Sequence, residues 1–500
     1  MAKIRSGESG IAMIVALFMV LVLSVLAASL IFVARTETFS SLNYRTMSEA
    51  RYGAESGVHS AVNYILWTYS PPEAASATDP ISNYNINVSP VTLTANGRPA
   101  VLSSDSEWAS NYPADAVRAA FVDAANDSLH SEGASSIMYS SRATLMSMKT
   151  IIDSASGLPS TLQTWSVTGR GRVEGVGSAA VEVSAVLERP MVPLYRYAAF
   201  SVDPNCESMN LAGGATVDSY DSTNPLVSGL PTLSQYGGNI GTNGGVAGTG
   251  DPTTVYGTLS SPRTGVGPCS AGNVTAFTTT NGASIEGGLV QLPQALTFPT
   301  PPAIVPAPPT TAFDVASAAS CASVSYCSIS SDTTTFSPPG STSKVQLGNV
   351  SVQNGKTLVL NAGIYEINSL DVKGDLLVAS GPVIIRVAGQ GFDLGEIVVD
   401  VTANAPVNPS YAAANLQFIY GGEADIRLRG NGTISAVVYA PNAVGDLAGL
   451  GSGDNGLYGS MLTKTVKATG GAGIHYDRNL DKSGYTIGNP VMSSFTWKSY

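Results

Sequence analysis

The stretch IAMIVALFMVLVLSVLAASLIFVA, from Ile11 to Ala34, decides how the rest of the chain is arranged, and it contains no charged residue. At 1.5 Å per helical residue it can cross the roughly 30 Å hydrocarbon core of a bilayer. A cleaved secretory signal has an apolar region of only about 7–15 residues. The run therefore predicts a membrane-spanning helix. Because Lys3 and Arg5 precede it, we expect the N-terminal tail in the cytoplasm and everything after Ala34 outside.

The helical pattern continues beyond the apolar run. Apolar residues recur mostly three or four positions apart, which predicts an amphipathic extension of the same helix. Pro71 and Pro72 end this pattern, because proline cannot continue a helix, so the helix is expected over 11–68. The residues of this face are Phe39, Leu42, Ala50, Ala54, Val58, Val62 and Ile65.

The composition is that of a β-rich protein outside the cytoplasm. With 500 residues the chain should form more than one domain. Charged residues make up 12%, about half the usual share, and glycine numbers 52. The net charge of −11 disfavours nucleic acid as a partner, since its binding needs a positive surface. No C-x-x-C pair is present and there are only three histidines, so we expect no metal and no cofactor.

A small α+β domain is predicted over 69–196. Pro113 can begin a short helix. The runs at 165–168 and 179–187 each alternate with a period of two, which indicates two strands of an antiparallel hairpin. A helix followed by a meander of this kind gives the α+β arrangement.

From residue 197 to residue 500 very short apolar runs alternate with Gly, Asn, Asp and Thr. Turn dipeptides separate several of them, for example Asn354-Gly355. This density of short strands favours a right-handed parallel β-helix, with a jelly-roll or sandwich as the alternative. Within it, 292–340 is rich in proline and small residues and includes PTPPAIVPAPPTT, which predicts an extended crossing segment. The fold class is therefore mainly β, preceded by a long helix and a small α+β domain.

The N-terminus resembles a type IV prepilin, in which a short basic leader ends in glycine and an apolar helix follows at once. The stretch GESGIAMIVALFMVLVLSVLAASLIFVARTETFSSLNYRTMSEARYGAESGVHSAVNYI is similar to the PilX-type N-terminal segment of minor pilins. The resemblance implies a leader over 1–10, cleavage by prepilin peptidase between Gly10 and Ile11, and methylation of Ile11. Major pilins carry a glutamate at the fifth mature position, which here is Val15. Its absence resembles PilX-like minor pilins and the tip pseudopilin of type II secretion.

Two later stretches also resemble known sequences. SVDPNCESMNLAGGATVDSYDS and GTISAVVYAPNAVGDLAGLGSGDNGLYGSMLTKTVKATGGAGIHYD are similar to the β-solenoid segment that follows PilX-type N-termini in large bacterial envelope proteins. This resemblance implies an architecture but points to no known activity.

The four cysteines predict two disulfides outside the cytoplasm. Cys321 and Cys327 close a short loop in a segment with little apolar core to hold it, so we expect them to pair. Cys206 and Cys269 then remain for each other. Three pairings are possible in principle.

A surface enzyme that acts on polysaccharide, or a glycan-binding β-helix, is the alternative function. Its candidate residues are acid pairs near each other in the sequence and a set of tyrosines, although core packing is the favoured role of the tyrosines. The acid pairs are Asp218 and Asp221, Asp371 and Asp375, Asp393 and Glu396, and Asp446 and Asp454; the tyrosines are Tyr420, Tyr439, Tyr458 and Tyr476. The match of 451–456 to G-x-G-x-x-G opens no helix, so it indicates a turn.

The function that the sequence predicts is that of a structural minor pilin or pseudopilin, without catalytic activity. It would be inserted in the inner membrane first. It would then assemble through its helix into a type IV pilus-like or type II secretion-like filament. A position at the tip fits Val15, and the β-rich head would serve assembly or adhesion. Its expected partners are other pilin subunits, prepilin peptidase and, for adhesion, a surface glycan or host surface.

Overall fold

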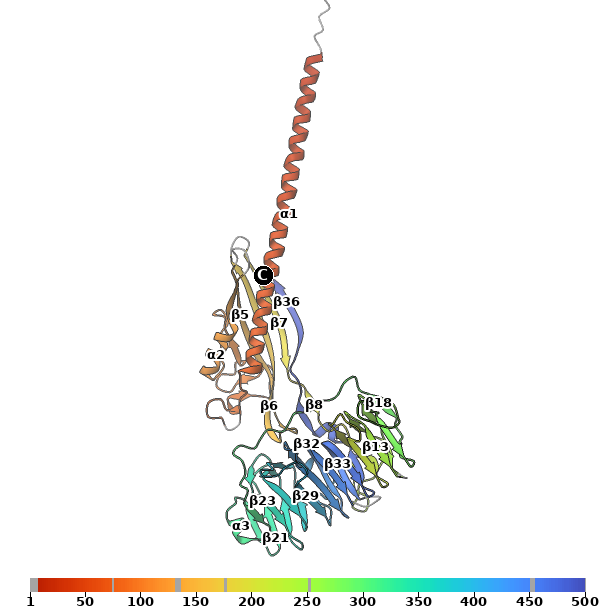
Figure 1. Ribbon diagram of the computed structural model, residues 1–500. Coiled ribbons are helices and arrows are strands. Elements are labelled where there is room, and N and C mark those ends of the chain that lie inside the picture. Colours follow the sequence, from red (N-terminus) through yellow and green to blue (C-terminus); the bar gives the residue numbers. More distant parts are fainter. Residues whose placement is uncertain are drawn as a thin grey trace, which may run out of the picture. The chain divides into compact units, whose positions relative to one another are not determined.

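The long helix predicted at the N-terminus is present as α1 (Glu8–Trp67) in the computed structural model, which describes residues 8–73, 76–130, 136–174, 178–250, 253–449 and 455–499. Figure 1 shows its first half extending away from the sheet on which its second half packs. No proline interrupts the helix, and the first prolines follow a few residues beyond its end.

The chain divides into two units, each with its own hydrophobic core. The N-terminal unit comprises Met1–Thr150, Thr161–Pro190 and Gly488–Tyr500. The parallel unit, named for its strand pairing, comprises Ile151–Ser160 and Met191–Ile487.

The N-terminal unit is built on an antiparallel sheet with the order β3-β5-β6-β7-β36, in which β4 also pairs with β5. The predicted hairpin is present, since Trp165 lies opposite Leu187 on the neighbouring strand. The helix expected after Pro113 is α2 (Asp115–Ala125). The strands are β3 (Val101–Ser103), β4 (Asp127–His130), β5 (Ser136–Asp153), β6 (Leu158–Glu174), β7 (Ala179–Glu188) and β36 (Val491–Ser499), with a separate pair β1 (Tyr84–Asn85) and β2 (Thr92–Leu93) after a 3-10 turn (Ile81–Asn83).

The last strand corrects the expected domain boundaries. β36 was expected in the C-terminal β region, but it pairs with β7 and so completes the sheet of the N-terminal unit. The tip of the β5–β6 hairpin, Ile151–Ser160, belongs instead to the parallel unit. There Gly157 lies against Ile384 and Ile419, and a Cβ on this glycine would come within 2.8 Å of both side chains.

Most of the parallel unit is one sheet of 22 strands whose pairings are parallel. In its first part the strands fall into three rows, and each strand pairs with the one three places later. The rows are β9 (Ala199–Ser201), β12 (Ile240–Thr242), β15 (Leu259–Ser261) and β18 (Leu289–Gln291); β10 (Met209–Ala212), β13 (Val246–Thr249) and β16 (Phe277–Thr280); and β11 (Thr216–Tyr220), β14 (Thr254–Val255) and β17 (Ser284–Ile285).

The second part repeats this arrangement. Its rows are β22 (Lys344–Gln346), β25 (Gly363–Ile367), β28 (Val383–Val387) and β30 (Leu416–Tyr420); β19 (Ala312–Asp314), β23 (Asn349–Val352), β26 (Ser369–Val372), β29 (Ile397–Ala403) and β31 (Asp425–Gly430); and, in a separate sheet, β21 (Thr333–Phe336), β24 (Thr357–Leu360) and β27 (Asp375–Val378), with β20 (Cys327–Ser330) antiparallel to β21. The first two rows continue into β32 (Ile434–Ala448) and β33 (Gly456–Thr469), and β34 (Gly473–Asp477) follows. β8 (Met191–Pro193) pairs with β35 (Tyr485–Ile487), and the short helices are α3 (Ala318–Ala322), α4 (Leu480–Ser483) and a 3-10 turn (Ala413–Asn415).

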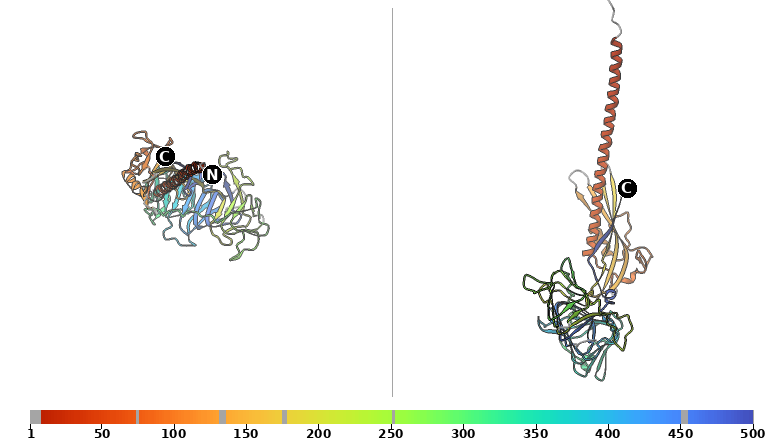
Figure 2. Two further views of the ribbon diagram at one scale, coloured as in Figure 1. Left: turned by 90° about the horizontal axis from the view of Figure 1, so that it is seen from above. Right: turned by 90° about the vertical axis from the view of Figure 1, so that its right-hand side faces the viewer.

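The two parts join in the middle of the sheet. β33 pairs with β9 and β10, and β34 pairs with β11, so the last strands of the unit lie beside its first strands. Figure 1 shows the resulting order across the unit, from β23 through β29, β32 and β33 to β13 and β18. The right-hand view of Figure 2 looks roughly along this succession. A jelly-roll is antiparallel, so the parallel pairing does not support that alternative.

The proline-rich segment crosses from one end of this sheet to the other. Residues 292–311 contain no strand or helix and connect β18 with β19. Side chains of the sheet bind its carbonyl oxygens: Tyr439 donates to Pro299 at 2.6 Å and Gln390 donates to Pro308 at 2.8 Å. The crossing is shorter than the predicted 292–340, because β19, α3, β20 and β21 occupy the later part.

Candidate functional site

The most unusual surface of the chain is the first half of α1. Every large apolar side chain from Ile11 to Val33 is between 45% and 74% exposed. The helix is long and apolar enough to cross a membrane, and the described residues contain one such helix. Ser24 donates its hydroxyl hydrogen to the carbonyl oxygen of Val20 at 2.7 Å, so this polar group is satisfied within the helix. An apolar surface of this size requires lipid or protein to cover it.

The predicted helix face divides into two parts. Phe39 and Leu42 are 63% and 37% exposed, whereas Val58, Val62 and Ile65 are buried in the core of the N-terminal unit. Val15 is 54% exposed, and Gly10 and Ile11 lie in the first turns of α1.

Two glycines of β6 allow α1 to lie directly on the sheet. A Cβ on Gly171 would be 1.9 Å from the carbonyl oxygen of Ala50, and a Cβ on Gly169 would be 2.1 Å from that of Ala54. Only glycine permits so close an approach of two backbones. These contacts hold the second half of α1 in place and thereby fix the direction in which the first half leaves the unit.

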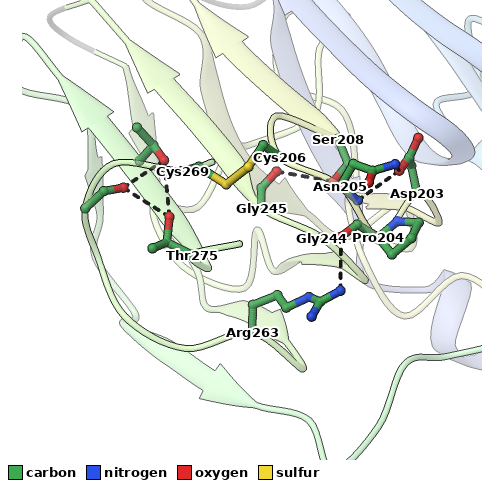
Figure 3. Close-up of a disulfide and its surroundings, with 12 residues drawn as sticks. Asp203, Pro204, Asn205, Cys206, Ser208, Gly244, Gly245, Arg263, Cys269 and Thr275 are labelled. Carbon is green, nitrogen blue, oxygen red and sulfur yellow. Dashed lines mark hydrogen bonds between the residues drawn. A yellow bond between two sulfur atoms is a disulfide. The ribbon is translucent and has the colours of Figure 1, made fainter. Parts of the chain in front are cut away.

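Both disulfides join the cysteines that were paired from the sequence. Figure 3 shows Cys206, just before β10, bonded to Cys269 in the loop over 262–275. In the same view Arg263 donates to the carbonyl oxygen of Pro204 at 3.1 Å, a second tie between this loop and the start of β10. The other disulfide joins Cys321 of α3 to Cys327 of β20.

Those acids of the candidate pairs that the structure describes do not form a common site. Asp371 is bound by Lys373 at 3.0 Å and Asp446 by Arg427 at 3.5 Å. Glu396 accepts a hydrogen bond from the backbone N–H of Asp393 at 2.7 Å. Such contacts are those of strand surfaces and turns.

Two further members of these pairs have separate surroundings. Hydrogen bonds from the side chain and backbone of Thr223 lower the pKa of Asp221. Asp375 is exposed at the start of β27. Asp454 and most of the 451–456 turn lie outside the described residues.

The structure instead brings Asp218 together with His475, which the sequence did not indicate. Their Oδ1 and Nδ1 atoms are 2.5 Å apart and both residues are buried. The ring of Tyr458 lies 4.5 Å from the imidazole, between centroids. No signal could have revealed this pair, because β11 and β34 become neighbours only when the end of the unit returns to its beginning.

This pair is not arranged as a catalytic site. His475 is 1% exposed, and its Nε2 contacts no nucleophile among the described residues. The described part of the chain also contains no group of three or more residues able to hold a metal ion. The pair therefore connects the two parts of the parallel unit.

The tyrosines of the last third are core residues. Tyr420, Tyr439, Tyr458 and Tyr476 are at most 3% exposed. Their hydroxyl groups serve the fold: that of Tyr476, for example, donates to the carbonyl oxygen of Tyr195 at 2.7 Å. They do not form an exposed stripe.

Comparison with known proteins finds a family match at the N-terminus. Residues 9–59 match the PilX N-terminal family, and residues 340–483 match a domain of unknown function (DUF7305). Among solved structures, the competence-associated pilin ComZ of Thermus thermophilus matches at 13% sequence identity, and the match covers 91% of this chain and 98% of that chain. Its TM-score of 0.26 does not establish a shared fold. No curated protein matches the chain. The family match over residues 9–59 confirms the resemblance of the N-terminal segment to the PilX type.

Proposed function

We propose that this protein is a minor pilin or pseudopilin, a structural subunit of a type IV pilus-like or type II secretion-like filament. The observation that carries the proposal is the exposed apolar half of α1, which continues without interruption into a helix packed on an antiparallel sheet. The match of residues 9–59 to the PilX N-terminal family supports the same role.

The mechanism that we propose begins in the inner membrane, with the bulk of the chain outside the cytoplasm. Prepilin peptidase removes residues 1–10 and leaves Ile11 as the new N-terminus. The exposed run Ile11–Ala34 then leaves the lipid and packs against the corresponding helices of other pilin subunits. Exchange of lipid for protein contacts keeps the apolar surface covered throughout.

The proposed position at the tip of the filament is supported by Val15. Its side chain brings no charge, and the run from Ile11 to Ala34 contains none. A terminal amine of a neighbouring subunit placed beside this run would be buried without a partner, at a cost of several kcal/mol. A single copy at the tip avoids most of this cost.

The parallel unit is, in this proposal, a right-handed β-solenoid head that is presented for assembly or adhesion to a glycan or another surface. Support comes from its three repeating rows and the regular pairing of each strand with the strand three places later. We further propose that the chain is not an enzyme, in line with the separate surroundings of its candidate acids.

The proposal is tested by N-terminal sequencing of the mature chain from cells, together with immunogold labelling of sheared filaments. We expect a chain that begins at Ile11 and label at filament ends. A mature chain that begins near Ala28 or Arg35 would contradict the pilin assignment. Label along the shafts at the density of a major subunit would contradict the tip position alone.

A further inference from the structure

Large exposed side chains occur both on α1 and on the last strand of its sheet. Tyr44 and Met47 of α1 are 78% and 37% exposed, and Phe495 and Trp497 of β36 are 57% and 59% exposed. We call these four residues the aromatic edge. All of them belong to the N-terminal unit. Large aromatic side chains are the commonest anchors of protein interfaces.

The spacing on α1 puts Tyr44 and Met47 on the helix face of Arg51, and Arg51 lies beside Trp497 of β36. Tyr44, Met47 and Arg51 are three, four and seven positions apart and share a helix face. The guanidinium of Arg51 lies 6.0 Å from the ring centroid of Trp497. Trp497 is opposite the buried Val183 of β7, and opposed residues of antiparallel strands project to the same face. Trp497 is therefore on the side of the sheet that α1 covers.

β36 is also an edge strand. Among the described strands it pairs only with β7, and the register shifts between Ser493 and Thr496. Figure 1 shows it beside β7, where α1 crosses the sheet. A free strand edge beside exposed aromatic rings is a surface suited to another protein chain.

Charge and distance narrow the choice of partner. Arg45 and Arg51 form ion pairs with Glu49 and Glu55, each at 2.9 Å, so this part of α1 carries no net positive charge to attract an anionic ligand. Tyr44, the member of the aromatic edge nearest the apolar run, follows Ala34 by ten residues and so lies about 15 Å beyond that run along the helix. The headgroup layer adds only about 5–8 Å on each side of the hydrocarbon core. Lipid therefore cannot cover the aromatic edge.

We propose that the aromatic edge binds a neighbouring pilin-like subunit, and this inference rests on the proposed function. In a filament the partner covers the apolar run, and the aromatic edge begins at Tyr44 on the same helix, beyond the polar stretch RTETFSS. A second chain with a helix as long as α1, whose 60 residues span about 90 Å, reaches both surfaces at once. A compact globular partner reaches only one of them.

The test uses the full chain in cells that make the filament, with the photocrosslinking residue benzoylphenylalanine in place of Trp497. The matched control places it at Trp67, which is 84% exposed at the far end of α1. We expect a covalent adduct with a protein that carries its own glycine-led apolar helix from position 497, and none from position 67. Adducts with lipid, with a protein that lacks such a helix, or equally from both positions would overturn the inference.

A second measurement separates binding from folding. Trp497→Ala should reduce the amount of chain in sheared filaments about tenfold, as expected for an aromatic anchor. Its melting temperature in detergent should stay unchanged, because the side chain is more than half exposed; Trp67→Ala should leave both unchanged. If the Trp497→Ala variant enters filaments in normal amount, the inference about the aromatic edge is wrong and the proposed function still stands. A wild-type chain that never enters filaments overturns both.

Discussion

The contact between α1 and β6 predicts that Gly171→Ala is severely destabilising. The added Cβ would lie 1.9 Å from the carbonyl oxygen of Ala50 and 2.5 Å from the backbone nitrogen of Ala54. A carbon–oxygen contact of about 3.3 Å is the shortest that recurs in proteins, so the helix must retreat by about 1.4 Å. Both opposing atoms are backbone, and no side-chain rotation can relieve the clash.

The expected cost lies at the upper end of the range for overpacking, about 3 kcal/mol. Retreat of the helix also weakens the packing of Ala50 and Ala54, which are fully buried. For a unit of this size 1 kcal/mol lowers the melting temperature by about 2–4 °C, so a fall of about 6–12 °C should result.

The four tryptophans provide a selective assay, because all of them belong to the N-terminal unit. Thermal unfolding of the full chain in detergent, followed by tryptophan fluorescence, therefore reports on this unit. Gly340→Ala is the control, since its added methyl group would meet no atom closer than 3.9 Å. If Gly171→Ala melts within about 1 °C of the wild type, the proposed seating of α1 on the sheet is wrong.

Three further outcomes are expected for the parallel unit. Glu366→Ala should lower the free energy of unfolding, measured with urea, by about 3–5 kcal/mol. The buried Arg386 lies 2.6 Å from the Glu366 carboxylate and would be left without its main partner. Burial raises the pKa of Asp425, so the folded state binds a proton more tightly and stability should fall as the pH rises above about 4; Asp425→Asn should reduce that slope in urea titrations from pH 4 to 7. The fragment 340–483 should aggregate on its own, as light scattering can show, while 191–487 stays monomeric, because only the longer piece covers the edges of β33 and β34.

The helix, the β6–β7 hairpin and the rich content of short strands could be predicted because each depends on residues close together in the chain. The apolar run and its periodicity define α1 locally, and the alternation around Trp165 defines β6. The division of the helix face was less predictable. Phe39 and Leu42 continue the same spacing as Val58 and Val62, but they are exposed and lie outside the core that buries the later residues.

The candidate site residues were harder to judge from the sequence. Acidic residues close together in the sequence suggested sites, but neighbours on a turn or strand point in different directions. The pairs that form lie far apart, such as Asp218 with His475 and Glu366 with Arg386. Each of these joins adjacent parallel strands at matching register positions, and the register was the property that the sequence left undetermined.

The register could not be read because the interval between paired strands varies. Val345 pairs with Tyr365 and Tyr365 with Ile385, but Ile385 then pairs with Phe418. Turns of different length occupy the corners, and they change the interval without changing the inward apolar pattern. A search for one repeat length therefore fails even though the pairing itself is regular.

The order of the layers is a further property that local sequence does not contain. β9, β10 and β11 come first in the unit, yet each acquires neighbours on both sides, from β12–β14 and from β33 and β34. The crossing over 292–311 makes this possible, because it carries the chain from β18 to the opposite end, so that the later strands build back toward the first. Proline suits this segment, since its extended backbone needs few partners and cannot add a competing strand to the sheet. The proline-rich composition thus determines where the chain stops pairing, and the position of that break determines which strands meet.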